Sequence, residues 1–127
     1  MNKAQQSGFT LIELVMVIVI LGVLAAVALP KFVSVDTEAK AAALAGIAGS
    51  LSSGSAINYA GRKVSTTKGV AVANCTDVAN TLQGGLPTGT NGYTITAAVV
   101  AVDTTVACTL TQTNGGATTT FSATGIL

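Results

Sequence analysis

The stretch that decides the fold is Gly8-Phe9-Thr10-Leu11-Ile12-Glu13-Leu14, which opens an apolar run that continues to Leu29. Glu13 is the single charged residue in that run. A carboxylate within a lipid-spanning helix is costly, so such a residue usually marks a function and has a partner. Because the run contains no cation, we expect the partner of Glu13 to come from outside this segment.

A short polar segment, residues 1–8, precedes the apolar run and ends in glycine, the residue with the least steric demand. Cleavage after Gly8 would make Phe9 the new N-terminus. In a low-dielectric bundle, its protonated amine would attract the Glu13 carboxylate of a neighbouring chain far more strongly than in water. Glu13 would then set the register between subunits.

Residues 8–14 resemble the type IV pilin and pseudopilin family, in which a dedicated prepilin peptidase cleaves at glycine before phenylalanine. The likeness extends to residue 32, and Pro30-Lys31-Phe32 followed by an alanine-rich helix is most similar to mannose-sensitive haemagglutinin pilins. This resemblance implies N-methylation of Phe9 and assembly of subunits around their N-terminal helices. It also implies an adhesive or motile extracellular fibre.

The same resemblance implies partners and a location. The partners are further copies of the chain in a helical filament, prepilin peptidase and the inner-membrane assembly machinery. The precursor is expected in the inner membrane, held by residues 9–29, before it enters an extracellular filament. The alternative within the family is a pseudopilin of a type II secretion system, which would form a short periplasmic assembly.

Two other interpretations fit part of this segment. Ala26-Val27-Ala28 matches the A-x-A site of ordinary signal peptidase, which would release a conventionally secreted small domain. Residues 9–29 would also span roughly 31 Å as a helix and fit a bilayer core as a plain anchor. Glu13 within the run and a leader with Lys3 as its one basic residue argue against both.

Beyond the apolar run, the pattern becomes amphipathic. Pro30 lacks a backbone donor and crowds the carbonyl four residues earlier, so we expect a bend or a local loss of helix there. Pro30 and Gly22 are the predicted residues of the helix bend. The helix is predicted over residues 9–60, with 30–60 as its amphipathic part, ending near Tyr59 to Gly61. One face is expected to cover a sheet, and its apolar members are Leu44, Ile47 and Leu51.

The second half favours strands. β-branched runs separated by turn residues predict an antiparallel meander over residues 92–101, 106–112 and 117–123, preceded by a short helix at 75–82. The fold class is therefore α+β, with a long helix on a sheet of three to four strands. The predicted domains are a leader at 1–8, the helix at 9–60 and a globular head at 61–127.

Cys75 and Cys108 are the two cysteines of the chain. Their arrangement resembles the pilin region whose disulfide frames a surface loop, and export to an oxidising compartment favours a bridge. The bridge would join the short helix to the middle strand and contribute roughly 3 to 4 kcal/mol. Two free thiols or a metal pair are the alternatives, although a closed zinc site is disfavoured because the chain has no histidine.

Charge and composition exclude several function classes. Without Lys3, five basic and five acidic side chains balance, whereas a nucleic-acid binder usually has a basic excess. A basic cluster is interpreted as a solvated loop after the helix: Arg62, Lys63 and Lys68. With no histidine, no paired carboxylates in a plausible cleft and no calcium or phosphate loop, we expect no enzyme, no cofactor and no metal site.

Overall fold

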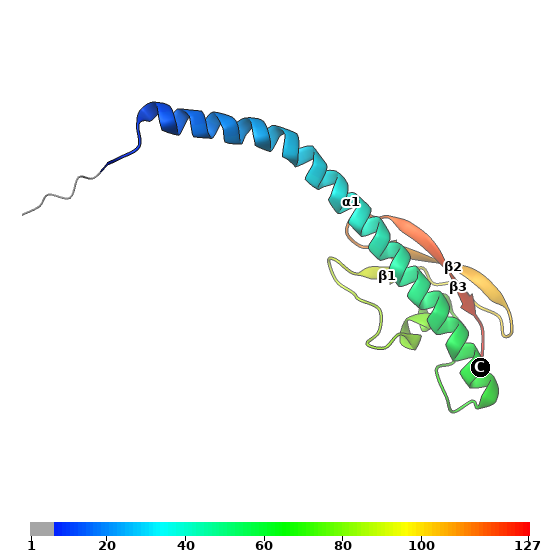
Figure 1. Cartoon of the computed structure of the whole chain (residues 1–127). Coiled ribbons are helices and arrows are strands. Elements are labelled where there is room, and N and C mark those ends of the chain that lie inside the picture. The colour runs from blue at the N-terminus through cyan, green and yellow to red at the C-terminus, as the bar shows by residue number, and fades with distance from the viewer. Residues whose placement is uncertain (1–6) are drawn as a thin grey trace, which may run out of the picture. The chain divides into compact units, whose positions relative to one another are not determined.

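The computed structural model describes residues 7–127 (Figure 1). Helix α1 (Leu11–Val64) is followed by the 3₁₀ helix η1 (Cys75–Thr81) and by strands β1 (Tyr93–Ile95), β2 (Thr105–Gln112) and β3 (Thr118–Thr124). The chain divides into two compact units, one ending at Ala39 and one covering Lys40–Leu127. The predicted α+β class is confirmed.

The three strands form one antiparallel sheet in the order β1-β2-β3. Cys108 pairs with Phe121 across β2 and β3, and Thr94 pairs with Thr111 across β1 and β2. This is the predicted meander, with the middle strand also central in the sheet.

The C-terminal half of α1 buries a narrow stripe against the rest of the second unit. Its buried members recur at alternating steps of four and three, the period of one helix face: Leu44, Ala48, Leu51, Ser55 and Asn58. The predicted core face is confirmed, since Leu44 and Leu51 are buried and Ile47 packs against the core while partly exposed. The stripe ends in polar residues that bond to neighbouring backbone.

Two serines of α1 complete the hydrogen bonding of the outer edge of β3. Ser52 Oγ accepts from the Ser122 N–H at 3.0 Å, and Ser55 Oγ accepts from the Thr124 N–H at 2.9 Å. Because β3 has a strand neighbour on one side, these N–H groups would otherwise lack a sheet partner. The serine-rich stretch of α1, poor in helix propensity, is therefore held by tertiary bonds.

The disulfide between Cys75 and Cys108 joins the start of η1 to the middle strand, with the two Cα atoms 5.8 Å apart. Both cysteines are buried in the core. Asn74 caps η1 by accepting from the Thr76 N–H at 3.2 Å, and Asp77 accepts in return from the Asn74 N–H at 2.8 Å. The predicted bridge and the short helix are present.

Two predicted boundaries are wrong. Helix α1 ends at Val64 rather than near Gly61, and its last turn is followed by a bond from the Ser65 N–H to the Gly61 carbonyl at 3.1 Å. The expected strand over 92–101 is reduced to the three residues of β1. The chain leaves β2 after Thr96, and the Val100 N–H donates instead to the Ala73 carbonyl at 2.8 Å.

Candidate functional site

The start of α1 is organised by Thr10 and Glu13. Glu13 Oε2 accepts from the Thr10 N–H at 2.8 Å, and the Glu13 N–H donates to Thr10 Oγ1 at 3.3 Å. This reciprocal pair is a capping box, which satisfies two backbone donors at the start of the helix. Glu13 therefore has a local partner within its own chain, in addition to the neighbour expected from the sequence.

The spacing Thr10-x-x-Glu13 is itself the sequence signature of a capping box. The interpretation of Glu13 as a charge in need of an external partner overlooked this local role. The helix begins at Leu11, so Thr10 is the residue that flanks it and Glu13 lies in its first turn. The local bond leaves one carboxylate oxygen of Glu13, Oε1, outside the capping interaction.

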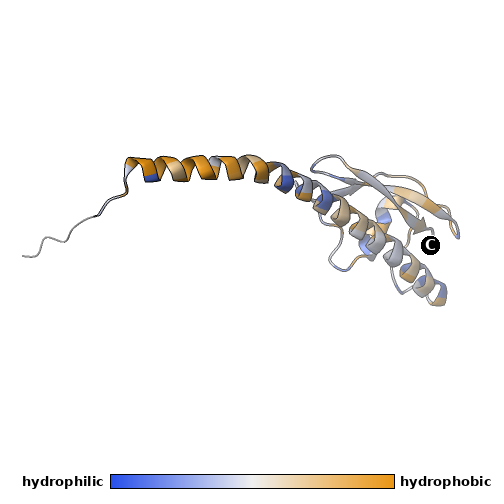
Figure 2. Cartoon of the chain, turned by 45° about the horizontal axis from the view of Figure 1, so that its top comes forward, coloured by the Kyte–Doolittle hydropathy of each residue, from blue (hydrophilic) through white to orange (hydrophobic). Residues whose placement is uncertain are grey.

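The first part of α1 exposes its apolar side chains on every face. Leu14, Ile18 and Leu21 are each more than half exposed, and Phe9, which precedes α1, is 92% exposed. In the ribbon of Figure 2 this part of the helix has the colour of hydrophobic residues along nearly its whole length. Within residues 7–127, α1 is the one helix long and apolar enough to cross a membrane, and none of its apolar window is buried.

Neither Gly8 nor Gly22 is required by the geometry of the described chain. A Cβ added at either position meets no heavy atom within 4 Å, and neither residue has a positive φ. The packing of residues 7–127 therefore gives no reason for a glycine at position 8. At Gly22 the missing side chain leaves room for close approach by a second helix.

Helix α1 continues through Pro30. The expected local loss of helix is therefore absent from the single chain. Two hydroxyl groups bond to carbonyls just beyond the proline: Ser34 Oγ donates to the Lys31 carbonyl at 2.8 Å and Thr37 Oγ1 to the Val33 carbonyl at 3.1 Å. Loss of helix at Pro30 or Gly22 on assembly stays a prediction.

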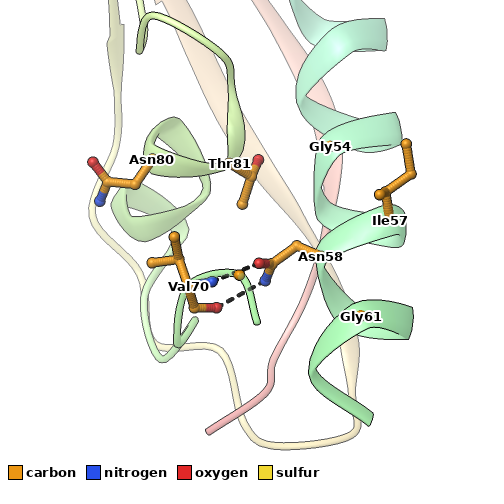
Figure 3. Close-up of a pocket in the computed structure, with 8 residues that line it drawn as sticks. Gly54, Ile57, Asn58, Gly61, Val70, Asn80 and Thr81 are labelled. Atoms are coloured by element: carbon orange, nitrogen blue, oxygen red, sulfur yellow. Dashed lines mark hydrogen bonds between the residues drawn. The ribbon is translucent and has the colours of Figure 1, made fainter. Parts of the chain in front are cut away.

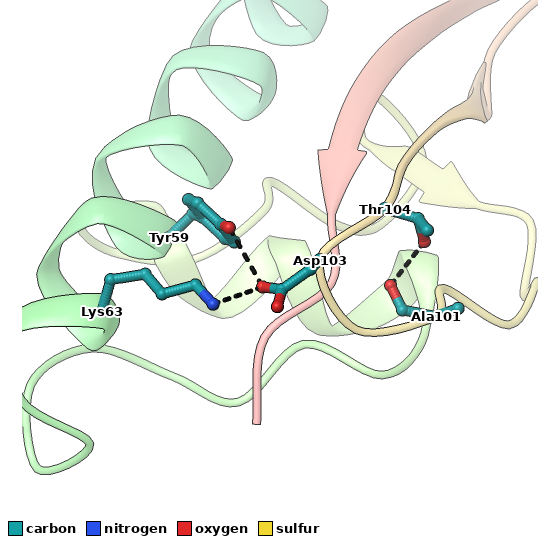
Figure 4. A network of polar contacts seen from close by, with 5 residues as sticks. All are labelled: Tyr59, Lys63, Ala101, Asp103 and Thr104. Carbon is teal, nitrogen blue, oxygen red and sulfur yellow. Dashed lines mark hydrogen bonds and ion pairs between the residues drawn. The ribbon is translucent and has the colours of Figure 1, made fainter.

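The last turn of α1 carries a polar network that the sequence did not indicate (Figure 4). Tyr59 Oη donates to Asp103 Oδ1 at 3.0 Å, and Lys63 Nζ lies 2.5 Å from the same oxygen. The hydrogen bond from Lys63, and then the one from Tyr59, lower the pKa of Asp103, while the hydrogen bond to Asp103 raises the pKa of Lys63. Because about half of each charged side chain is exposed, solvent weakens this pair.

The prediction that the basic cluster lies in a loop after the helix is wrong for two of its members. Arg62 and Lys63 belong to the last turn of α1 and not to a loop that follows it. Lys63 also lies 5.3 Å from the centre of the Tyr59 ring, within the range of a cation–π contact. No local pattern announces this arrangement, since Asp103 is far from the helix in sequence and adopts a positive φ of 58° in its turn.

A groove of about 340 Å³ runs beside the same end of α1 (Figure 3). Asn58 anchors one wall, because its Nδ2 donates to the Val70 carbonyl at 2.8 Å and its Oδ1 accepts from the Val70 N–H at 2.7 Å. Gly54 forms a close approach to η1, where an added Cβ would lie 2.6 Å from Thr81 Oγ1. The lining is uncharged and offers neither an acid nor a base.

Metal-ligating side chains do not gather in the described part of the chain. No three His, Cys, Asp or Glu residues among positions 7–127 are placed to hold one ion. Both thiols are engaged in the Cys75–Cys108 bridge, which rules out the alternatives of free thiols and a thiol metal pair. The chemistry of the chain therefore centres on the uncovered apolar helix and its first turn.

Comparison with known proteins shows which family this chain resembles. The profile of the prokaryotic N-terminal methylation motif matches residues 3–29. The type IV narrow pilus major component PilA5 of Thermus thermophilus is 36% identical over 122 residues, covering 92% of this chain and 95% of the relative. The chain belongs to the type IV pilin and pseudopilin family. The predicted resemblance is confirmed at the level of the family.

A second relative matches this pilin-family chain over a shorter stretch. The type II secretion system core protein G of Pseudomonas aeruginosa is 55% identical over 40 residues, which is 32% of this chain but 28% of the relative's length. No solved structure gives a significant match. The likeness to secretion pseudopilins is therefore concentrated in a short segment, whereas the likeness to PilA5 extends through the head.

Proposed function

We propose that this pilin-family chain is the structural subunit of a type IV pilus-like filament. In this proposal residues 1–8 are a leader, of which 1–6 lie outside the described residues, and prepilin peptidase cleaves after Gly8. Phe9 is then N-methylated, and residues 9–29 hold the subunit in the inner membrane until it joins an extracellular adhesive or motile fibre. The role is structural, with no catalytic step and no cofactor.

The observation that carries this proposal is the uncovered apolar surface of α1. Residues 11–29 are exposed or nearly so, and no element among the described residues 7–127 covers them. An apolar surface of that length is unstable in water and needs lipid or other protein around it. Lipid surrounds it before assembly, and the same segments of neighbouring subunits surround it in the fibre.

Glu13 provides the register in this packing. In the single chain the Thr10 N–H donates to its carboxylate, which orients one oxygen and leaves the other outside this bond. Cleavage after Gly8 would create a cation at Phe9. In a dry bundle of helices, the Phe9 amine of a neighbour would neutralise Glu13 only when the two chains are correctly staggered.

The deciding experiment is Glu13→Gln in cells that assemble the protein. Glutamine keeps the oxygen that accepts from Thr10 and the size of the side chain, but it removes the charge. We expect membrane insertion and cleavage to persist, and the filament yield by electron microscopy and shear fractionation to fall on the order of tenfold or more, as for loss of a buried ion pair.

The control for this experiment is Thr10→Val, which removes the hydroxyl of the capping box and leaves Glu13 charged. We expect it to retain most of the filament yield. If Glu13→Gln assembles normally while Thr10→Val does not, the capping box explains Glu13 and the register role is wrong.

A pseudopilin of a type II secretion system is the second candidate. The 55% identity over 40 residues to core protein G favours it, although that identity covers only 32% of this chain. Electron microscopy of cells at ordinary expression levels separates the two candidates. A pilus subunit forms long surface filaments under these conditions, whereas a pseudopilin forms a short periplasmic assembly. Secretion of an exoprotein that depends on this gene, without surface filaments, would establish the second candidate.

A further inference from the structure

Two asparagines of the head precede a glycine, at Asn91-Gly92 and Asn114-Gly115. Both asparagines are exposed. In such dipeptides the glycine nitrogen reaches the side-chain carbonyl of asparagine easily, because glycine has no Cβ to hinder the approach. The structure places these two chemically equivalent dipeptides in different backbone environments.

Gly92 is buried and held on both sides. Its N–H donates to the Gly89 carbonyl at 3.1 Å, and its own carbonyl accepts from the Thr113 N–H at 3.0 Å. The backbone of Thr88 also lies so close to Gly92 that even a Cβ would collide with it. An attack by the Gly92 nitrogen would break its hydrogen bond and displace a packed turn.

Gly115 is in the opposite situation. It lies in the exposed loop between β2 and β3, with φ at 104°, and nothing lies within 4 Å of the position of an added Cβ. In the part of the chain that the structure describes, the Gly115 N–H donates no hydrogen bond. The base of the loop is fixed independently, because the Gln112 N–H donates to the Ala117 carbonyl at 2.8 Å.

We propose that Asn114 is a site of spontaneous deamidation, selected by the fold over Asn91. The Gly115 nitrogen bonds to Cγ of Asn114, the bond from Cγ to Nδ2 breaks, and the nitrogen's proton leaves with the departing ammonia. The resulting cyclic imide is opened by water at either carbonyl, which gives aspartate or isoaspartate at position 114. No oxidant, reductant or enzyme is required.

The neighbourhood of Asn114 accommodates the product. Asn114 Nδ2 donates to Asn91 Oδ1 at 3.1 Å across the two loops. A carboxylate at position 114 reverses this contact, since Asn91 can turn its amide and donate to the new charge, which makes a stronger hydrogen bond. Each converted head gains one negative charge.

The test is an ageing experiment on the full-length protein in detergent micelles, incubated in mildly alkaline buffer and followed by peptide mass spectrometry. We expect conversion at Asn114 to be on the order of tenfold faster than at Asn91, as for the loss of a hydrogen bond in the slower reaction. In the reduced chain unfolded by guanidinium, the two rates should converge. Equal rates in the folded protein, or a faster rate at Asn91, would overturn the proposal.

Two matched variants complete the test. Asn114→Gln lengthens the side chain and removes the five-membered imide, so the acidic species that accumulates on anion exchange should disappear. Asn91→Gln should leave that species in place. Persistence of the acidic species in Asn114→Gln contradicts the assignment, whichever site then proves to be modified.

Discussion

Gly8 is a residue whose identity the described part of the chain, residues 7–127, does not explain. A side chain at this position would meet open space, and the backbone needs no positive φ. The reason for glycine, in the proposed function, is the active site of the peptidase that cleaves after it. The constraint is intermolecular and is therefore invisible in the packing of the single chain.

We accordingly predict that Gly8→Val leaves folding and membrane insertion unchanged but blocks maturation. The precursor should accumulate with residues 1–8 attached, as measured by intact mass and by sequencing of the N-terminal peptide. Gly22→Val is the control, because it adds the same side chain in open space and lies far from the cut. Normal maturation of Gly8→Val would refute the proposed cleavage site.

Asp103 gives a prediction about pH. Its pKa is lowered in the folded protein, so its contribution to stability is present above the ordinary aspartate range and is lost as pH falls through the folded pKa. The pKa of Lys63 is raised, so its contribution is present below the ordinary lysine range and is lost as pH rises through the folded pKa. The pair is therefore complete at neutral pH.

Asp103→Asn should lower the thermal midpoint by a constant amount around neutral pH, and the difference from the parent should shrink below about pH 4. Asparagine tolerates the positive φ of this turn, so backbone strain does not enter the comparison. Thermal melts of the detergent-solubilised full-length chain provide the measurement. A difference that stays unchanged down to strongly acidic pH would show that the charge of Asp103 is not responsible.

At the scale of elements, Ser55 shows why a helix with poor local propensity is stable here. Ser55→Ala removes the acceptor of the Thr124 N–H and should destabilise the head by about 1 kcal/mol, the loss of a hydrogen bond partly offset by the better helix propensity of alanine. Exposed Ser53→Ala is the matched control and should be neutral or slightly stabilising. Chemical denaturation measures both, and equal effects would contradict the role assigned to Ser55.

The elements also show which parts of the fold are readable from sequence. The stripe with Leu44 and Leu51 follows from periodicity, because one face of a helix repeats locally. The length of β1 does not follow from periodicity. After Thr96 the backbone stops bonding to β2 and bonds instead to the segment that contains Ala73. That exchange depends on a partner more than twenty residues away, which no local pattern encodes.

The same distinction holds for the candidate site. Gly8, Phe9 and Glu13 were found because they form a contiguous motif, and the capping box at Thr10 was equally local but was overlooked. The ion pair of Lys63 with Asp103 joins residues brought together only by folding. Sequence reasoning therefore indicates the family from a contiguous motif, but it does not reach the contacts that folding creates in the head.

At the scale of the whole molecule, the disulfide compensates for the small size of the head. It closes a loop with a sequence separation of 33 residues, which in the chain-entropy model contributes roughly 3 to 4 kcal/mol. We predict that the double variant Cys75→Ala, Cys108→Ala loses about that much stability by guanidinium denaturation. Membrane insertion should persist, because the bridge lies in the second compact unit. A loss below about 1 kcal/mol would show that the core suffices alone.

The serine bonds of α1 to β3 have a consequence for the filament proposed above. A sheet with two open edges invites another sheet to join it, which is the route to cross-β aggregates. Here Ser52 and Ser55 occupy N–H groups along one edge, and the strand at the other edge, β1, has three residues. Edge-to-edge pairing between heads along a fibre is therefore disfavoured, and the contacts that build the fibre come from the apolar helix.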